Sequence, residues 1–241
     1  MLTERYFISV KGAVIMFKER NFRLSMSLIF NIAIIVLEII GTVICASNTG
    51  IEMFTFYTTD SNLFAMAVSI IYAFYTARCL FSEKKQDIPK PVKTLKYISV
   101  CCLNLTFLVV IAIFAPASGE GGYEYMLFNG DFFYFHFSCP LLTLISFILF
   151  EGDTQYELSY SFAAVIPTLI YAAAAVALNL LRVIEGPYPF LYVYDQPVTL
   201  SVMWFIMIAD TAFLSSSLIQ KLGSTFACST KKKANVKSAV K

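Results

Sequence analysis

Apolar residues are arranged along the chain in six long runs that are separated by short polar connections. The runs lie at about 24–46, 56–81, 96–115, 132–150, 159–181 and 198–219. A helix rises 1.5 Å per residue, so about twenty apolar residues are enough to cross the hydrocarbon core of a bilayer. The pattern therefore predicts an all-α polytopic membrane protein, a bundle of six transmembrane helices that uses most of the chain.

The composition supports this prediction and excludes several classes of protein. The chain has 241 residues, of which 58% are hydrophobic and 14% charged, and its mean hydropathy is +0.71. Typical soluble domains contain about 45–50% apolar residues and about 25% charged residues. A net charge of +2 excludes nucleic-acid binding driven by bulk charge, and a single histidine excludes a site with several histidine ligands. The six cysteines fall in or beside apolar runs, so no disulfide framework, metal site or cofactor is expected.

Lysine and arginine gather on one side of the predicted spans. They precede the first span, fill the connection between the second and third, and follow the sixth. The connections 47–55 and 116–131 contain none, and 182–197 contains only Arg182. The positive-inside rule therefore predicts that both termini are cytoplasmic and that these three connections lie outside.

The two ends of the chain are expected to be simple. Residues 1–23 mix apolar and basic side chains, which predicts a cytoplasmic segment with an interfacial helix against anionic lipid. Residues 220–241 are rich in Lys, Ser and Ala, and we expect a basic, disordered cytoplasmic tail.

Polar side chains collect at the predicted outer ends of the spans. The second span opens with residues 54–62, the fourth opens with residues 131–140, and the last outer connection carries residues 185–195. Because all three stretches share one side of the membrane, we expect the starts of the second and fourth spans to adjoin. Polar groups are costly in hydrocarbon, so this shared position indicates a functional site.

A threonine and a histidine in these stretches suit nucleophilic chemistry. His136 is the one histidine of the chain, and imidazole is the side chain best suited to proton transfer near neutral pH. Beside a hydroxyl it would deprotonate Thr58 or Thr59, which would then attack a carbonyl carbon. The alternative is that His136 bonds a neighbouring helix and that the two threonines cap the second span. The spacing leaves both interpretations open.

Other residues near these stretches are candidates for binding. Asn62 shares a helix face with Thr58 and Thr59, and Cys139 shares one with His136. Five tyrosines of the outer stretches would line a pocket for an acyl chain: Tyr57, Tyr123, Tyr125, Tyr134 and Tyr188.

Two ionisable residues lie deeper in the predicted spans. Glu38 lies roughly 12 Å from the outer end of the first span, and Asp210 lies at a similar depth in the sixth. For Glu38 a functional role and a structural tie between helices are equally favoured. For Asp210 the structural role is favoured.

Three motifs resemble one membrane-protein family. They are Tyr-Thr-Thr-x-Ser-Asn-Leu at residues 57–63, His-x-x-x-Pro at residues 136–140, and Tyr-Pro-Phe-Leu at residues 188–191. With the six spans, this combination resembles the androgen-induced gene 1 and FAR-17a-like superfamily, and in particular its bacterial six-span branch. The resemblance covers residues 24–219 and implies an integral protein of a bacterial plasma membrane.

The resemblance also implies an activity. Animal members of the family hydrolyse fatty acid esters of hydroxy fatty acids with a threonine and a histidine. By this likeness His136 takes the histidine role, and the nucleophile is Thr59 by one alignment of the motif and Thr58 by another.

The main hypothesis is therefore a membrane-embedded lipid-ester hydrolase or acyl-transfer enzyme that acts on a lipid or fatty acyl substrate. Asn62 and Ser61 would donate to the oxyanion, and Asp60 or a tyrosine would orient the imidazole. The residues expected to contact substrate are Tyr57, Asp60, Ser61, Asn62, Cys139, Tyr188 and Glu38. The rival hypotheses are a lipid or small-molecule transporter, or its binding subunit, that uses the same pocket, and a non-catalytic scaffold.

Overall fold

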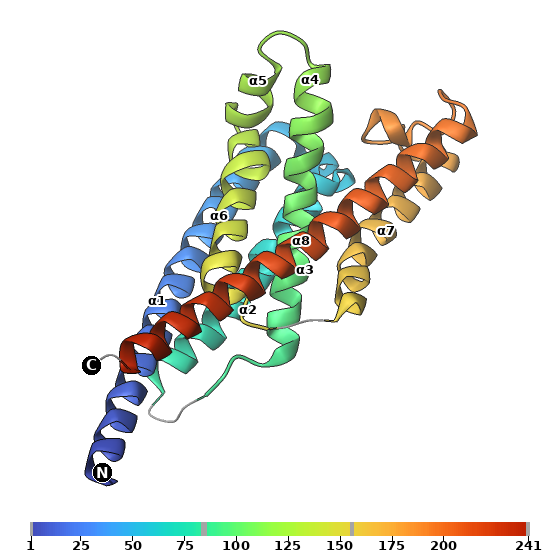
Figure 1. Cartoon of the computed structure of the whole chain (residues 1–241). Coiled ribbons are helices and arrows are strands. Elements are labelled where there is room, and N and C mark those ends of the chain that lie inside the picture. Colours follow the sequence, from blue (N-terminus) through green and yellow to red (C-terminus); the bar gives the residue numbers. More distant parts are fainter. Residues whose placement is uncertain (1, 83–85, 155–156, 240–241) are drawn as a thin grey trace.

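A computed structural model describes residues 2–82, 86–154 and 157–239, with side chains described from 18 to 228 within these ranges. The described residues form helices and no strands (Figure 1). Six helical segments are long and apolar enough to cross a membrane: Lys18–Thr55, Tyr57–Phe81, Lys90–Ala117, Phe133–Glu151, Leu158–Leu180 and Val198–Cys228. The prediction of a six-span helical bundle is confirmed at this level, since each predicted run lies inside one of these segments or agrees with it to within one residue.

Several spans are built from more than one kind of helix. The elements are α1 (Leu2–Thr49), η1 (Gly50–Thr55), α2 (Tyr57–Phe81), α3 (Lys90–Val109), η2 (Val110–Phe114), α4 (Ala115–Ala117), α5 (Gly122–Phe128), η3 (Phe133–Ser138), α6 (Cys139–Ser146), η4 (Phe147–Glu151), α7 (Leu158–Leu180), η5 (Pro189–Leu191) and α8 (Val198–Ala239). The segments η2, η3 and η4 are π-helical, and η1 and η5 are 3₁₀ turns. Short π segments inside helices are rare overall, and those that do occur are often found at functional sites.

Both ends of the described chain are helical. Helix α1 runs without a break from Leu2 into the first span. Helix α8 continues to Ala239, whereas a disordered tail was predicted for residues 220–241; Val240 and Lys241 lie outside the described residues. Lys and Ala are good helix formers, and extending an existing helix costs far less than starting one, so the long apolar helix propagates into the basic tail.

The third span begins six residues before the predicted start at 96. Pro89 precedes the helix, and Pro91 lies in its first turn, where the missing N–H of a proline has no partner to lose. Lys93 and Lys96 therefore lie inside the helix. Lys93 pairs with Asp153 at 2.8 Å, whereas Lys96 is fully buried in the bundle.

The spans form two packed groups. Helices α1, α2, α3 and α6 pack around one interior, and α7 and α8 pack against each other and against α3. Helix α8 crosses the bundle obliquely and also packs against α1 and η4 (Figure 1). Glycine allows close approach at two crossings. A Cβ on Gly41 of α1 would lie 2.7 Å from Cβ of Tyr134, and one on Gly152 would lie 2.7 Å from Cα of Gly223 in α8. Small residues at helix crossings are typical of membrane bundles.

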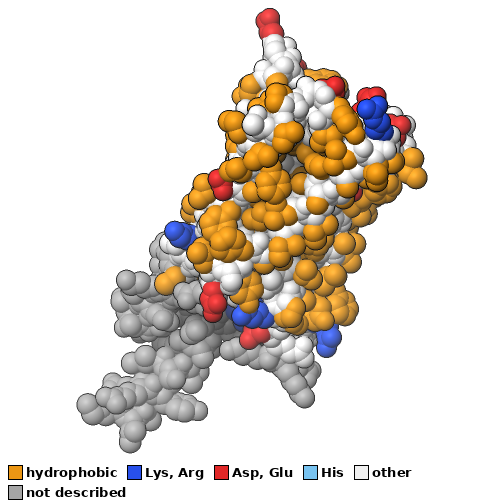
Figure 2. All heavy atoms as spheres, turned by 90° about the vertical axis from the view of Figure 1, so that its right-hand side faces the viewer, with side chains coloured by type: hydrophobic (Ala, Val, Ile, Leu, Met, Phe, Trp, Pro, Cys, Tyr) orange, Lys and Arg blue, Asp and Glu red, His pale blue; other side chains and the backbone are white. Residues whose placement is uncertain are grey.

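The outer surface of the bundle suits a lipid environment. Large apolar side chains are exposed along α1, α2, α7 and α8, and Figure 2 shows them covering most of the face it presents, with most charged groups toward the two ends. The six cysteines are free, as expected, and all except Cys228 are buried. Both termini lie at one end of the bundle (Figure 1); the opposite end is called the distal end below.

Candidate functional site

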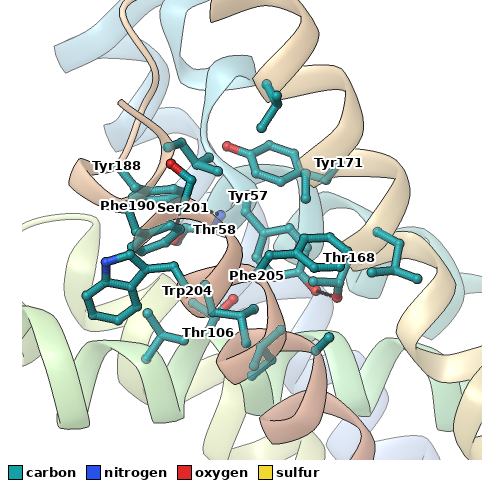
Figure 3. Close-up of a pocket in the computed structure, with 18 of the residues that line it drawn as sticks. Tyr57, Thr58, Thr106, Thr168, Tyr171, Tyr188, Phe190, Ser201, Trp204 and Phe205 are labelled. Atoms are coloured by element: carbon teal, nitrogen blue, oxygen red, sulfur yellow. Dashed lines mark hydrogen bonds between the residues drawn. The ribbon is translucent and has the colours of Figure 1, made fainter. Parts of the chain in front are cut away.

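A pocket opens at the distal end between α3, α7, α8 and the start of α2 (Figure 3). Its volume is about 150 Å³. The connection between α7 and α8 covers one side of it with η5. The lining is predominantly aromatic and aliphatic, and its largest side chains are Tyr57, Phe114, Tyr171, Tyr188, Phe190, Trp204 and Phe205.

Tyr188 is the centre of the aromatic wall. Its ring stacks on Phe114 and Phe190 at centroid distances of 5.5 and 5.2 Å, and it meets Phe56 edge-on at 6.1 Å. Phe190 in turn contacts Trp204 of α8 at 5.8 Å. The aromatic contacts therefore attach the covering connection to η2, the continuation of α3, on one side and to α8 on the other.

The hydroxyl groups of the pocket wall are largely satisfied by one another. Tyr57 and Thr168 share a hydrogen bond of 2.8 Å, and the hydroxyl of Tyr171 donates to the carbonyl of Thr55 at 2.7 Å. The Tyr188 oxygen accepts from the backbone N–H of Thr58 at 3.2 Å and lies 3.4 Å from the Thr58 hydroxyl. The wall therefore presents mainly carbon to the cavity, although many of its residues carry oxygen.

Burial raises the pKa of Tyr188, which lies outside the six membrane-spanning segments. The two hydrogen bonds from Thr58 lower the pKa of Tyr188, but by less than burial raises it. Tyr188 is thus a neutral phenol at physiological pH, so it orders the wall and does not act as a base.

Two polar side chains of the lining lack a partner for their donor groups among the described residues. The hydroxyl of Ser201 and the indole N–H of Trp204 make no side-chain hydrogen bond with the residues that the structure describes. Both belong to the first turns of α8, and Figure 3 shows them on the same side of the cavity, next to Phe190. A hydroxyl and an indole N–H are donors for a carboxyl or ester oxygen.

The predicted substrate residues of the second span are divided between two faces of α2. Tyr57 and Thr58 line the pocket. Thr59 is buried on another face, where it contacts Cys45 of α1, and Ser61 bonds Thr106 of α3 at 3.1 Å.

Asp60 lies near the pocket without lining it. Its half-buried carboxylate is close enough for its charge to interact with the hydroxyl groups of Tyr171 and Tyr188. Of the five tyrosines proposed for an acyl pocket, Tyr57 and Tyr188 line this one, whereas Tyr123, Tyr125 and Tyr134 do not.

His136 lies outside the pocket lining. Its Nδ1–H donates to the carbonyl of Met126 at 2.8 Å, and its ring stacks on Phe132 at 4.7 Å. This bond fixes the tautomer in which Nε2 carries the lone pair, which is the form that a general base requires. Among the described residues no hydrogen bond joins His136 to Thr58 or Thr59.

The starts of the second and fourth spans do adjoin, as their shared depth predicts. The amide of Asn62 donates to the carbonyl of Thr58 at 2.7 Å and to the carbonyl of Phe135 at 3.2 Å. The same amide thus ties the threonine segment of α2 to the residue that precedes His136. Cys139 and Glu38 lie together deeper in the bundle, between α6 and α1, and do not line the pocket.

The sequence analysis did not identify the walls contributed by α3, α7 and α8. The polar residues of these walls lie in apolar runs, where a single hydroxyl or indole group does not indicate a binding site. They are Thr106, Thr168, Ser201 and Trp204. The motif at residues 57–63 supplied two lining residues, Tyr57 and Thr58, and the motif at residues 188–191 identified the covering connection.

Comparison with family models, with curated proteins and with solved structures gives no match for this chain. Function is therefore inferred from the geometry of the site.

Proposed function

We propose that the protein binds the acyl chain of a lipid or fatty acid in the distal pocket. The observation that carries this proposal is an apolar cavity at the edge of a membrane bundle in which most of the wall hydroxyls are already hydrogen-bonded within the protein. Such a wall offers little to a polar solute. Ser201 and Trp204 supply two donors, which suit the oxygen atoms at the head of an acyl chain.

The size of the cavity limits what enters it. A cavity of about 150 Å³ is comparable with an engineered cavity that accepts benzene, and it is smaller than a pocket for a whole drug-sized ligand. The site therefore accommodates a short stretch of chain. The remainder of the ligand would lie against exposed apolar side chains of α8, such as Val202 and Ile206.

Selectivity must come from the polar end of the ligand and from shape. In a bilayer the acyl chain leaves an environment as apolar as the pocket, so burying its methylene groups contributes little net free energy. Hydrogen bonds from Ser201 and Trp204 to a carboxyl or ester oxygen are made in a medium of low dielectric constant, where they are stronger than in water. The proposed function is thus recognition of an acyl head group at a fixed membrane depth.

Ester hydrolysis is the second candidate function, and the Asn62 bridge is the observation that favours it. The bridge holds a pocket threonine and the histidine segment against each other. In this reaction a threonine oxygen attacks the ester carbonyl while imidazole accepts the hydroxyl proton. The alcohol leaves with that proton, and water then hydrolyses the acyl-threonine. Thr58 is the better nucleophile candidate of the two because it lines the pocket, whereas Thr59 is only 2% exposed and faces α1.

Filling the cavity is expected to weaken acyl binding, and α7 offers a matched pair of alanines. Ala172 lines the pocket, whereas Ala173 is exposed on the outside of the same helix. Overpacking a filled site costs about 1–3 kcal/mol, and 1.4 kcal/mol corresponds to tenfold in affinity. We therefore expect Ala172→Phe to bind a radiolabelled fatty acid about tenfold more weakly in nanodiscs, and Ala173→Phe to bind it normally. Equal binding by both variants would mean that the pocket is not the site.

A further inference from the structure

A column of buried polar side chains lies inside the group formed by α1, α2, α3 and α6. At its termini end, the Glu151 carboxylate accepts hydrogen bonds through Oε1 from Ser27, Asn31 and Ser146, at 2.8, 2.6 and 2.8 Å. The Lys96 ammonium donates to Asn31 at 2.7 Å and to Ser69 at 3.1 Å, and it lies 3.9 Å from Oε2 of Glu151. These two charges balance each other, although Oε2 of Glu151 has no hydrogen-bond donor among the described residues.

Glu38 has no such arrangement. Its side chain is 0% exposed, and neither carboxylate oxygen has an N–H or O–H donor among the described residues. Asn31, which binds Lys96, precedes Glu38 by seven residues on α1, a separation of about 10 Å. The ammonium group of Lys96 makes its close contacts with Asn31, Ser69 and Glu151, and its charge reaches the Glu38 carboxylate only at longer range.

Three other buried oxygen atoms, on α1, α6 and α2, lack a hydrogen-bond partner among the described residues. The hydroxyl of Thr42 lies one turn further along α1 and is buried without a partner among the described residues. Cys139 of α6 lies beside the Glu38 carboxylate, and the hydroxyl of Thr143, one turn further along α6, is also buried without a partner. The side-chain carbonyl oxygen of Asn62 is also buried without a hydrogen-bond partner among the described residues. The amide nitrogen of that side chain donates to the carbonyl of Phe135 in η3, one turn before Cys139.

We infer that Glu38 is the binding site of a monovalent cation, either a proton or a sodium ion. A carboxylate buried in hydrocarbon without a strong donor or counter-ion is very costly, so the group must take up a positive charge from outside. Carboxylate, hydroxyl and amide oxygens are the ligands that hard cations prefer. The adjoining π-helical segment η3 also interrupts the regular backbone pattern at this depth, as helices of membrane ion sites often do.

The surroundings of Glu38 allow its charge to change. The titratable groups that face it are Cys139 from α6 and Lys96 from α3, with Glu151 of η4 behind Lys96. Helix α2 contributes the neutral side chains of Asn62 and Ser69 to the column, and His136 of η3 is directed instead at the carbonyl of Met126. Because Lys96 and Glu151 neutralise each other, the net charge of the column is set by the occupancy of Glu38.

The two cations are distinguished by carbodiimide labelling of the purified protein in nanodiscs. Dicyclohexylcarbodiimide enters apolar regions and modifies protonated carboxyl groups, and the modified residue is located by peptide mass spectrometry. If the site binds a proton, the adduct at Glu38 is expected to disappear as the pH is raised, equally in sodium chloride and choline chloride. If it binds sodium, sodium chloride is expected to suppress the adduct at a pH where choline chloride does not.

Two results would overturn the inference: no adduct at Glu38 at any pH, or an adduct that neither pH nor sodium changes. The variant Glu38→Gln provides a second measurement, because its amide cannot exchange a cation. Its melting temperature should lose the sodium or pH dependence that the wild type shows through this site. The control Glu124→Gln, at an exposed residue of α5, should keep that dependence. Identical dependence in all three proteins would contradict the inference.

Discussion

Replacing Lys96 with methionine is expected to lower the free energy of unfolding by about 3–5 kcal/mol, the usual cost of removing one partner from a buried ion pair. The side chain of Lys96 is completely buried, and that of Glu151 is almost so. Without the ammonium group, the Glu151 carboxylate would stay in the bundle with only neutral donors around it. The measurement is thermal or denaturant unfolding of the purified protein in detergent micelles.

The double variant Lys96→Met/Glu151→Gln separates loss of charge balance from loss of packing. It removes both charges, and the glutamine oxygen still accepts hydrogen bonds from Ser27, Asn31 and Ser146. We expect it to recover much of the lost stability. A Lys96→Met variant as stable as the wild type, or a double variant less stable than Lys96→Met, would show that the pair is not a balanced unit.

Loss of His136 is expected to remove most turnover of a lipid ester if the second candidate function is correct. Positioned general bases contribute about 10²–10⁴-fold to rate, so His136→Ala should lower kcat by that amount. Thr58→Val should have a similar effect and Thr59→Val a smaller one, because only Thr58 lines the pocket. The double variant His136→Ala/Thr58→Val should lose little more, since a nucleophile and its base act as one unit.

The matched control for these variants is Thr211→Val, which removes an exposed hydroxyl of α8 that bonds only its own helix. It should keep full turnover of a fluorogenic acyl ester in the same detergent. If His136→Ala folds and turns over at the rate of the control, the hydrolase proposal fails, and acyl binding remains the proposed function.

The sequence predicted the six spans because long apolar runs have few alternatives in a bilayer. It also predicted that the start of the second span would meet the start of the fourth, which the bond from Asn62 to Phe135 confirms. The contact of Tyr188 with Thr58 brings the third polar stretch to the same place. These elements were predictable because polar residues in otherwise apolar surroundings mark a shared depth.

The buried ion pair was not predictable from the sequence, because its two residues do not stand in apolar surroundings along the chain. Lys96 and Glu151 lie at the ends of their predicted runs, where charged residues ordinarily mark the membrane boundary. Only tertiary packing shows that both point into the bundle. The pocket walls on α7 and α8 were missed because threonine, serine and tryptophan in an apolar run give no signal of which helix face they occupy. The helical tail was missed because composition alone does not reveal that α8 is already formed before it.

Photo-crosslinking with a fatty acid that carries a diazirine on its chain tests the central claim most directly. The wild-type protein in nanodiscs is irradiated with the probe, and the adducts are located by peptide mass spectrometry. Acyl binding in the distal pocket predicts adducts at lining residues of α7 and α8, such as Val176 and Ala209, which excess unlabelled fatty acid removes. Adducts confined to outward-facing residues such as Ile170 and Met203, with no competition by unlabelled fatty acid, would contradict it.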